Sequence, residues 1–461
     1  MSYPLEPTPE QMRVMGDAAL SFVIDHIAGL PDAPSWGNEG WEEMAARVRG
    51  SAPEDGRGLD QILADLGPAV AKSFNTAGPG YLAFIPGGGL FAAALADLIA
   101  DAVNRYVGLW FPAPALATIE WSAIRWLCDV FAYPAHARGI LTSGGSLSNF
   151  SAVVTARHEL LGDDLRDGTI YVTEHTHHSV VKSATLAGIP AANVRRVACR
   201  DDLSMDPDGL ARAIGADRAA GARPFMVVAS MGTTNTGAID PIADVIEVAR
   251  GLWVHADAAY GGFFHLTERG RRALAGIEHA DSITLDPHKG MFLPYGTGAL
   301  LVRDGQKLRA AHSEGADTAY LQDLAADAEI PNFTEYSPEL SRDFRGLRVW
   351  LPIQLHGLRA FRAALDEKLD LTERLYQGLK AIPELEIPWE PGLTIVAFRL
   401  RDADNGANRA FLDHINASKR VFLSSTMLDG RFTLRACIVS HRTHADRIDE
   451  AIEIIARAAR A

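Results

Sequence analysis

Short apolar runs alternate with segments of helical periodicity from about residue 87 to about residue 306 of this chain. Each run is continuous, without the polar residue at every second position that marks a strand with one face in water. The pattern predicts an α/β fold with a central, mostly parallel sheet that helices cover on both faces. The predicted strands are residues 139–142, 170–172, 225–229, 252–257, 282–285 and 298–302.

The N-terminal segment is predicted to be helical. Thr8 is placed as the N-cap of a first helix, Pro9 suits its first position, and Gln11 completes a capping box. A few helices cannot bury their apolar faces alone, so this arm is expected to pack on a second subunit. We therefore expect a homodimer with the functional site near the interface.

The C-terminal segment differs again from the central pattern. Beyond Ser341, a long helical region is followed by strand-like runs at 393–400 and 432–439 and by helices from Ala407 and His444. We predict three parts: an N-terminal helical arm (1–85), a large α/β domain (86–340) and a small C-terminal α+β domain (341–461).

The composition favours a soluble protein that acts on small molecules. The chain has 461 residues and a formal net charge of −14, which disfavours nucleic acid and anionic membranes as partners. The most apolar segment, 87–102, contains two aspartates and is too short to span a bilayer, and we expect no secretory signal. Cys128, Cys199 and Cys437 have no metal-ligand spacing, so reduced thiols and a cytoplasmic location are expected.

Polar side chains follow the predicted strands where ligands of such sheets bind, at the carboxyl ends. Lys289 lies in Asp286-Pro287-His288-Lys289-Gly290, just after one strand, and Asp257 ends another. Thr234 and Ser146 also lie at or just past strand ends. A lysine and an aspartate so placed suit pyridoxal phosphate, which needs an amine for a Schiff base and a carboxylate to keep its ring nitrogen protonated.

A glycine- and serine-rich loop joins a strand to a helix at Gly144-Gly145-Ser146-Leu147-Ser148-Asn149. Glycines let the backbone approach an anion, and hydroxyls and helix N-terminal amides donate to it. We expect Ser146, Ser148 and the Leu147 amide to hold the cofactor's phosphate. His288, beside the lysine, is expected to reach the phosphate or a substrate carboxylate.

Two further segments suggest contacts with the cofactor ring. His175 and His177 are two residues apart with no third metal ligand at a suitable spacing nearby, so no metal site is expected. The planar imidazole of His177 is expected to stack on the ring instead. Thr234, in the turn Gly232-Thr233-Thr234, is expected to bond near the ring hydroxyl.

With these motifs the chain resembles the group II pyridoxal-phosphate decarboxylases, which include aromatic L-amino-acid and glutamate decarboxylases. The resemblance covers nearly the whole chain and implies the type I fold of pyridoxal-phosphate enzymes. It implies that Lys289 forms the Schiff base, that Asp257 pairs with the ring nitrogen and that Ala259 packs beneath the ring. It further implies that His177 stacks above the ring. The motifs that carry it are Gly144 to Asn149, His177, Gly232-Thr233-Thr234, Asp257-Ala258-Ala259-Tyr260, Asp286-Pro287-His288-Lys289, 79–86 and 341–347.

The resemblance also implies a catalytic tyrosine on a mobile loop, here Tyr320 in Asp317-Thr318-Ala319-Tyr320-Leu321. This tyrosine protonates the carbanion left by carbon dioxide, and relatives that deaminate oxidatively typically have phenylalanine there. Two features depart from the family pattern. Asp286 replaces an asparagine, which is expected to change contacts near the phosphate, and the pocket segment Phe84-Ile85-Pro86-Gly87-Gly88-Gly89 is unusually rich in glycine.

The predicted function is decarboxylation of an L-amino acid to the amine and carbon dioxide. An aromatic substrate is favoured, because Trp110 and Phe84 are candidates for an apolar side-chain pocket and no dense cationic cluster is visible. The alternatives are decarboxylation of an acidic amino acid such as glutamate, oxidative deamination to an aldehyde, and transamination. A cofactor-binding protein without catalytic activity is the remaining hypothesis.

Overall fold

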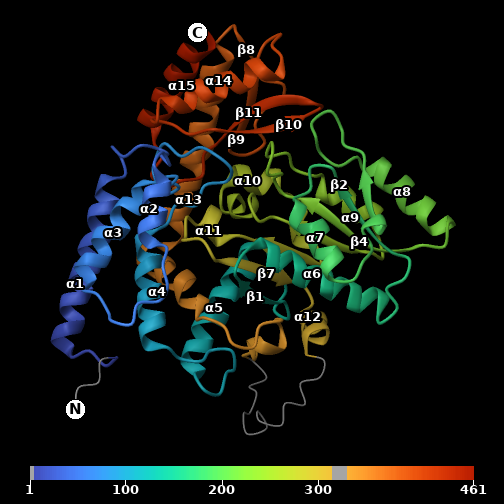
Figure 1. Ribbon diagram of the computed structural model, residues 1–461. Coiled ribbons are helices and arrows are strands. Elements are labelled where there is room, and N and C mark those ends of the chain that lie inside the picture. Colours follow the sequence, from blue (N-terminus) through green and yellow to red (C-terminus); the bar gives the residue numbers. More distant parts are fainter. Residues whose placement is uncertain (1–4, 314–329) are drawn as a thin grey trace.

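A seven-stranded sheet forms the centre of the protein in the computed structural model, which describes residues 5–313 and 330–461 (Figure 1). Within the described residues the strand order is β1-β7-β6-β5-β4-β2-β3. The predicted α/β fold and six of these strands are confirmed. The strands are β1 (Arg138–Thr142), β2 (Gly168–Thr173), β3 (Val194–Val197), β4 (Arg223–Ser230), β5 (Trp253–Asp257), β6 (Ser282–Leu285) and β7 (Gly298–Val302).

The sheet is mostly parallel, as predicted, with one reversed strand. Neighbouring strands from β3 to β6 pair in parallel, whereas β7 is antiparallel to both β6 and β1. The carboxyl ends of β4, β5 and β6 therefore meet at one edge. The sequence did not predict β3, an edge strand whose apolar run is interrupted by the partly buried Arg195 and the exposed Arg196.

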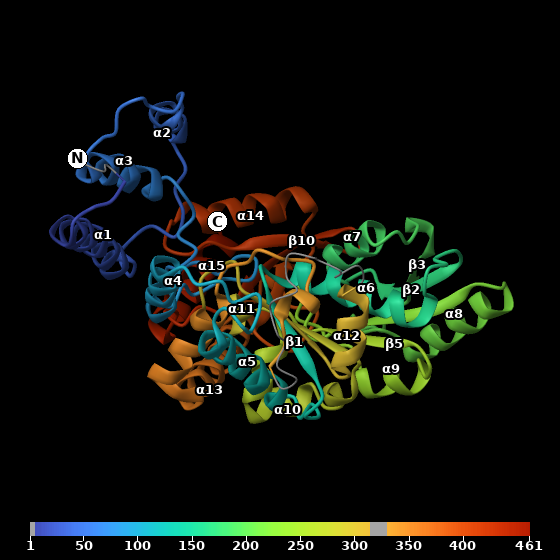
Figure 2. The same ribbon diagram turned by 90° about the horizontal axis from the view of Figure 1, so that it is seen from below.

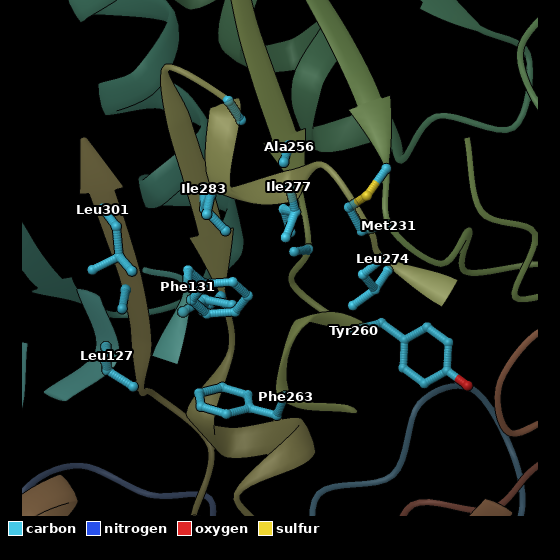
Figure 3. Close-up of a cluster of buried hydrophobic side chains, with 14 of the residues drawn as sticks. Leu127, Phe131, Met231, Ala256, Tyr260, Phe263, Leu274, Ile277, Ile283 and Leu301 are labelled. Atoms are coloured by element: carbon cyan, nitrogen blue, oxygen red, sulfur yellow. The ribbon is translucent and has the colours of Figure 1, made fainter. Parts of the chain in front are cut away.

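Both faces of the sheet are covered, because alternate residues of each strand enter two separate apolar cores. Ala256, Ile283 and Leu301 point into one core together with the rings of Phe131 and Phe263 (Figure 3). Their neighbours along the strands enter the other core. Helices α5 (Pro114–Val130), α8 (Pro207–Ala219) and α9 (Ile242–Val248) contribute to the first core, and α6 (Gly145–Leu161), α7 (His178–Leu186) and α12 (Gly305–His312) to the second.

The N-terminal arm stands away from the body of the protein (Figure 2). Its first helix begins as predicted, with a capping box between Thr8 and Gln11. None of the residues in its first three helices is buried. The arm comprises α1 (Pro9–Gly29), α2 (Trp41–Val48) and α3 (Leu59–Ala71), and α4 (Phe91–Val103) follows.

The C-terminal part packs α14 and α15 on an antiparallel four-stranded sheet of order β10-β11-β9-β8. The long helix α13 (Arg345–Lys380), kinked at Gly357, packs on α4 and α5 and also on α15. It thus connects the two bodies, and the division at residue 341 stays a prediction. The elements are β8 (Leu385–Glu386), β9 (Ile395–Leu400), α14 (Asn405–Ala417), β10 (Ser424–Leu428), β11 (Arg431–Cys437) and α15 (Ala445–Ala459), with short helices α10 (Glu268–Ala273) and α11 (Pro287–Gly290) in the large domain.

Among the described residues, we find no helix that is long and apolar enough to cross a membrane.

Candidate active site

A cavity of about 390 Å³ opens at the carboxyl ends of β4, β5 and β6, beside the N-terminus of α6. Ser230 and Asp257 are the last residues of β4 and β5, and Asp286 follows β6. The predicted site residues that line the cavity are Ser146, His177, Thr234, Asp257, Ala259, Asp286, His288 and Lys289. The structure therefore brings these eight together.

Lys289 is paired with Asp286, one turn earlier across the short helix α11. Lys289 Nζ lies 2.9 Å from Asp286 Oδ2, and the Asp286 side chain is only 4% exposed. His288 Nε2 lies 3.6 Å from the same oxygen. Burial acts to lower the pKa of Lys289, but the charge of Asp286 and its hydrogen bond raise the pKa above its ordinary value. Lys289 is therefore held as an ammonium in this arrangement.

Asp257 is oriented by Asn149, a residue of α6. Asn149 Nδ2 donates to Asp257 Oδ2 at 3.1 Å, and the Ala259 amide donates to Asp257 Oδ1 at 3.3 Å. Asn149 lies in the glycine–serine motif, but no role was predicted for it from the sequence. Its spacing of four residues from Gly145 places it on the same face of the helix, a signal that was available in the sequence.

Asn149 also connects two histidines, one on each side. Its Oδ1 accepts from Nε2 of the buried His255 at 3.0 Å, and its Nδ2 donates to Ser179 Oγ at 3.0 Å. Ser179 in turn bonds to His177 Nδ1 through its hydroxyl (2.7 Å) and its amide (3.3 Å). Since Nδ1 of His177 accepts, the neutral ring carries its proton on Nε2. Burial lowers the pKa of His177, which favours this neutral form.

The N-terminus of α6 also lines the cavity, close to Asp286 and Ala259. Gly144 has φ 153°, outside the range that other residues adopt readily, and no side chain caps the helix after it. The first amides of a helix, here those of Gly145 and Ser146, have no intrahelical acceptor and can bind an anion.

Two predicted phosphate contacts have other partners. The Leu147 amide donates to the Gly144 carbonyl at 3.0 Å, and the buried Ser148 hydroxyl shares a hydrogen bond of 2.8 Å with the Thr142 hydroxyl. The geometry therefore does not bring Leu147 and Ser148 to the cavity with the other predicted residues. Helix geometry explains this result, because only the first residues of α6 point their free amides outward.

Comparisons with known proteins identify the family of this chain. The model of the pyridoxal-dependent decarboxylase conserved domain matches residues 42–401. The aromatic-L-amino-acid decarboxylase of Bacillus atrophaeus is 31% identical over 97% of this chain and 95% of that protein. The L-2,4-diaminobutyrate decarboxylase of Rhizobium meliloti is 30% identical over 88% of this chain and 83% of that protein. The crystal structure of Oryza sativa TDC with PLP and tryptamine superposes with a TM-score of 0.93 and 26% identity, covering 100% of this chain and 99% of that one.

The chain belongs to the pyridoxal-dependent decarboxylase family. It is an amino-acid decarboxylase that uses pyridoxal phosphate.

The cavity of this decarboxylase fits that cofactor in its chemistry. An amine and a carboxylate follow neighbouring strands, and the open helix terminus lines the same cavity. The cavity is narrow at Gly145, where a Cβ atom would lie 3.1 Å from Asp286 Oδ2 and 3.3 Å from Ala259 Cβ. Within the described residues, the buried Asp286 Oδ1 has no hydrogen-bond partner. Buried polar atoms in proteins nearly always have a hydrogen-bond partner, so a bound ligand is the expected partner of this oxygen.

The C-terminal part of the decarboxylase supports the site through Arg435 of β11. This buried arginine donates to the carbonyls of Thr234 (2.6 Å) and Phe84 (2.9 Å) and to Ser424 Oγ (2.8 Å). Phe84 is 55% exposed and held beside the Thr234 turn, whereas Trp110 packs against the main core. The predicted apolar pocket of Phe84 and Trp110 stays a prediction. The predicted proton donor, Tyr320, lies outside the described residues.

Proposed function

We propose that this decarboxylase converts an aromatic L-amino acid to the corresponding amine and carbon dioxide. The observation that carries the proposal is that Lys289, Asp257 and the open N-terminus of α6 line one cavity. This arrangement matches the needs of a cofactor that has an aldehyde, a ring nitrogen and a phosphate. No other described site on the chain combines these groups.

The cofactor, when bound, withdraws the electron pair that remains on the substrate's α-carbon as carbon dioxide leaves. Asp257, held in place by Asn149, keeps a proton on the ring nitrogen. Lys289 would supply the amine that holds the cofactor. Asp286 would keep this amine protonated whenever it is free. Ser146 and the first amides of α6 hold the phosphate, as the open end of this helix supports.

The roles of the other site residues are those implied by the resemblance to the group II decarboxylases. Ala259 and His177 line the cavity. By the resemblance, they would confine the ring from its two sides. Thr234 bonds near the ring hydroxyl, and His288 binds the phosphate or the substrate carboxylate. Leu147 and Ser148 stay predicted contacts. Tyr320 donates the proton to the substrate's α-carbon.

The charges of the cavity favour an aromatic over an acidic substrate. Among the described residues that line the cavity, Lys289 is the one lysine, and no arginine is present to bind a side-chain carboxylate. The Bacillus atrophaeus relative and the tryptamine-bound structure support the same substrate class. A screen of the common amino acids for carbon dioxide release tests the proposal. Release from aromatic amino acids is expected, and release from glutamate, aspartate or 2,4-diaminobutyrate alone would overturn the aromatic assignment.

Two variants test the site itself. Lys289→Ala is expected to abolish turnover and the near-visible absorbance of lysine-bound cofactor, while Asp257→Ala keeps the fold but loses most activity. The matched control is Lys307→Ala, which removes a partly exposed lysine paired with Glu159 at 2.9 Å. Loss of the absorbance in the control but not in Lys289→Ala would refute the assignment. Normal cofactor absorbance without turnover of any amino acid would instead support the non-catalytic hypothesis.

Product analysis separates decarboxylation from oxygen-dependent aldehyde formation. Tyr320, a proton donor rather than a phenylalanine, favours the amine. Amine as the main product is expected, whereas aldehyde with ammonia or peroxide would favour the second reaction.

We further propose that the decarboxylase is a cytoplasmic homodimer. The free thiols of all three cysteines support a reducing compartment. The arm supports the dimer, since Val14 and Ile24 of α1 are 71% and 49% exposed. Light scattering is expected to give a dimer, and Ile24→Glu is expected to weaken it. The control Leu186→Glu changes a similarly exposed residue on α7, far from the arm. An active monomer would contradict the proposal.

A further inference from the structure

Three potential metal ligands meet beyond the carboxyl ends of β2 and β3. Glu174 and His175 directly follow the last residue of β2, and Cys199 lies two residues after β3. These strands lie at the edge of the sheet (Figure 2). They pair in parallel, with Thr173 opposite Val197. The carboxylate oxygen, imidazole nitrogen and thiol sulfur all lie within 4.8 Å of one another.

The backbone that carries these ligands is fixed by local bonds. The His175 amide donates to Thr173 Oγ1 at 3.2 Å, and the Thr173 amide donates to Thr176 Oγ1 at 2.9 Å. On the other strand, Cys199 forms an isolated antiparallel bridge with Met205. The three donors are therefore held near one another before any ion arrives, which reduces the entropy lost on binding.

The cluster is also accessible. The side chains of His175 and Cys199 are half-buried, while that of Glu174 is exposed. A hydrated ion can reach the two inner ligands from the Glu174 side. The other two cysteines, Cys128 and Cys437, are buried in the cores and offer no comparable site.

We propose that Glu174, His175 and Cys199 form a binding site for Zn²⁺, with water in the fourth position. The donor set selects the class of ion. A thiolate and an imidazole favour Zn²⁺ and similar transition metals, whereas Mg²⁺ and Ca²⁺ require oxygen ligands. A thiolate and a carboxylate together neutralise the charge of a divalent ion. The site lies outside the cavity that binds the cofactor, so it is independent of the proposed decarboxylation.

The first test measures metal binding to the full chain with its cofactor, after removal of metals with a chelator. Equilibrium dialysis against Zn²⁺ alone is expected to show one more bound equivalent in the parent protein than in Cys199→Ser. Loss of an outer partner of a metal ligand typically lowers affinity about 10–100-fold, so loss of the ligand itself should lower it at least as much. The same stoichiometry and affinity in both proteins would overturn the proposal.

A matched control is available at Glu278 and His279, an adjacent pair 3.5 Å apart that precedes β6 instead of following β2. Like Glu174 and His175, these two residues are an adjacent glutamate and histidine. They are not part of the three-ligand cluster found among the described residues. His279→Asn is expected to leave the affinity unchanged, whereas His175→Asn lowers it. Equal losses in both variants would show unspecific binding by exposed histidines and would overturn the proposal.

A second measurement needs no variant. Zn²⁺ is expected to slow alkylation of Cys199 in the parent protein, followed by mass spectrometry of the labelled peptide. Co²⁺ added alone is expected to give the absorption of a thiolate-bound cobalt site in the red, away from the cofactor band. Unchanged alkylation of Cys199 at saturating Zn²⁺ would show that the thiol is not a ligand.

Discussion

Asn149→Ala tests the network that orients Asp257. The Asn149 side chain is 1% exposed and makes three hydrogen bonds, to Asp257 Oδ2, Ser179 Oγ and His255 Nε2. A bond to a charged group contributes about 1.5–3 kcal/mol, and a neutral bond contributes about 1 kcal/mol. Removing all three from a buried site is expected to lower the free energy of unfolding by about 3–5 kcal/mol. Urea denaturation of the cofactor-free protein measures this loss without the contribution of ligand binding.

The control is Asn416→Ala in the C-terminal part. Asn416 is also buried and makes two side-chain bonds, both to the backbone of Leu423. This variant is expected to lose about 2 kcal/mol of stability but to retain the cofactor affinity of the parent. Asn149→Ala should lose affinity as well, because Asp257 then keeps only the bond from Ala259. A stability loss below about 1 kcal/mol in Asn149→Ala would refute the network as drawn.

Three further predictions concern charge and proton transfer. Asp286→Asn is expected to lower the pKa of Lys289, because the variant lacks the carboxylate that stabilises the ammonium form. The pH dependence of lysine labelling in the cofactor-free protein measures this pKa. An unshifted profile would contradict the Lys289–Asp286 ion pair. Burial lowers the pKa of His255 to about 4, so the unfolded chain takes up this proton first as the pH falls below about 6.5. Acidification from pH 7 to 4 should therefore cost about 3 kcal/mol of stability through this group, and His255→Gln should flatten the profile in that window. Tyr320→Phe should slow protonation of the substrate and shift the product from amine toward aldehyde; amine formation at the parent rate would remove Tyr320 from the mechanism.

Much of the fold could be predicted because local pattern and burial coincide in the large domain. The predicted strand 225–229 lies within β4, and 282–285 coincides with β6, since continuous apolar runs need cover on both faces. β3 was missed because Arg195 and Arg196 lie on an edge strand, where burial is incomplete. The reversal of β7 was missed because apolar content does not encode strand direction.

Residue types and their spacing were enough to predict which chemical groups the chain carries and that those at strand ends share one edge of a sheet. Lys289, Asp257, Thr234 and Ser146 meet in one cavity because parallel strands end together. The partners of these groups, in contrast, became known from the folded structure. It paired Lys289 with Asp286, joined Asn149 to His255, and brought Cys199 beside His175. The physical reason is that hydrogen bonds and metal ligation depend on atomic distances of a few ångströms, which are set by strand pairing and side-chain packing rather than by residue spacing along the chain.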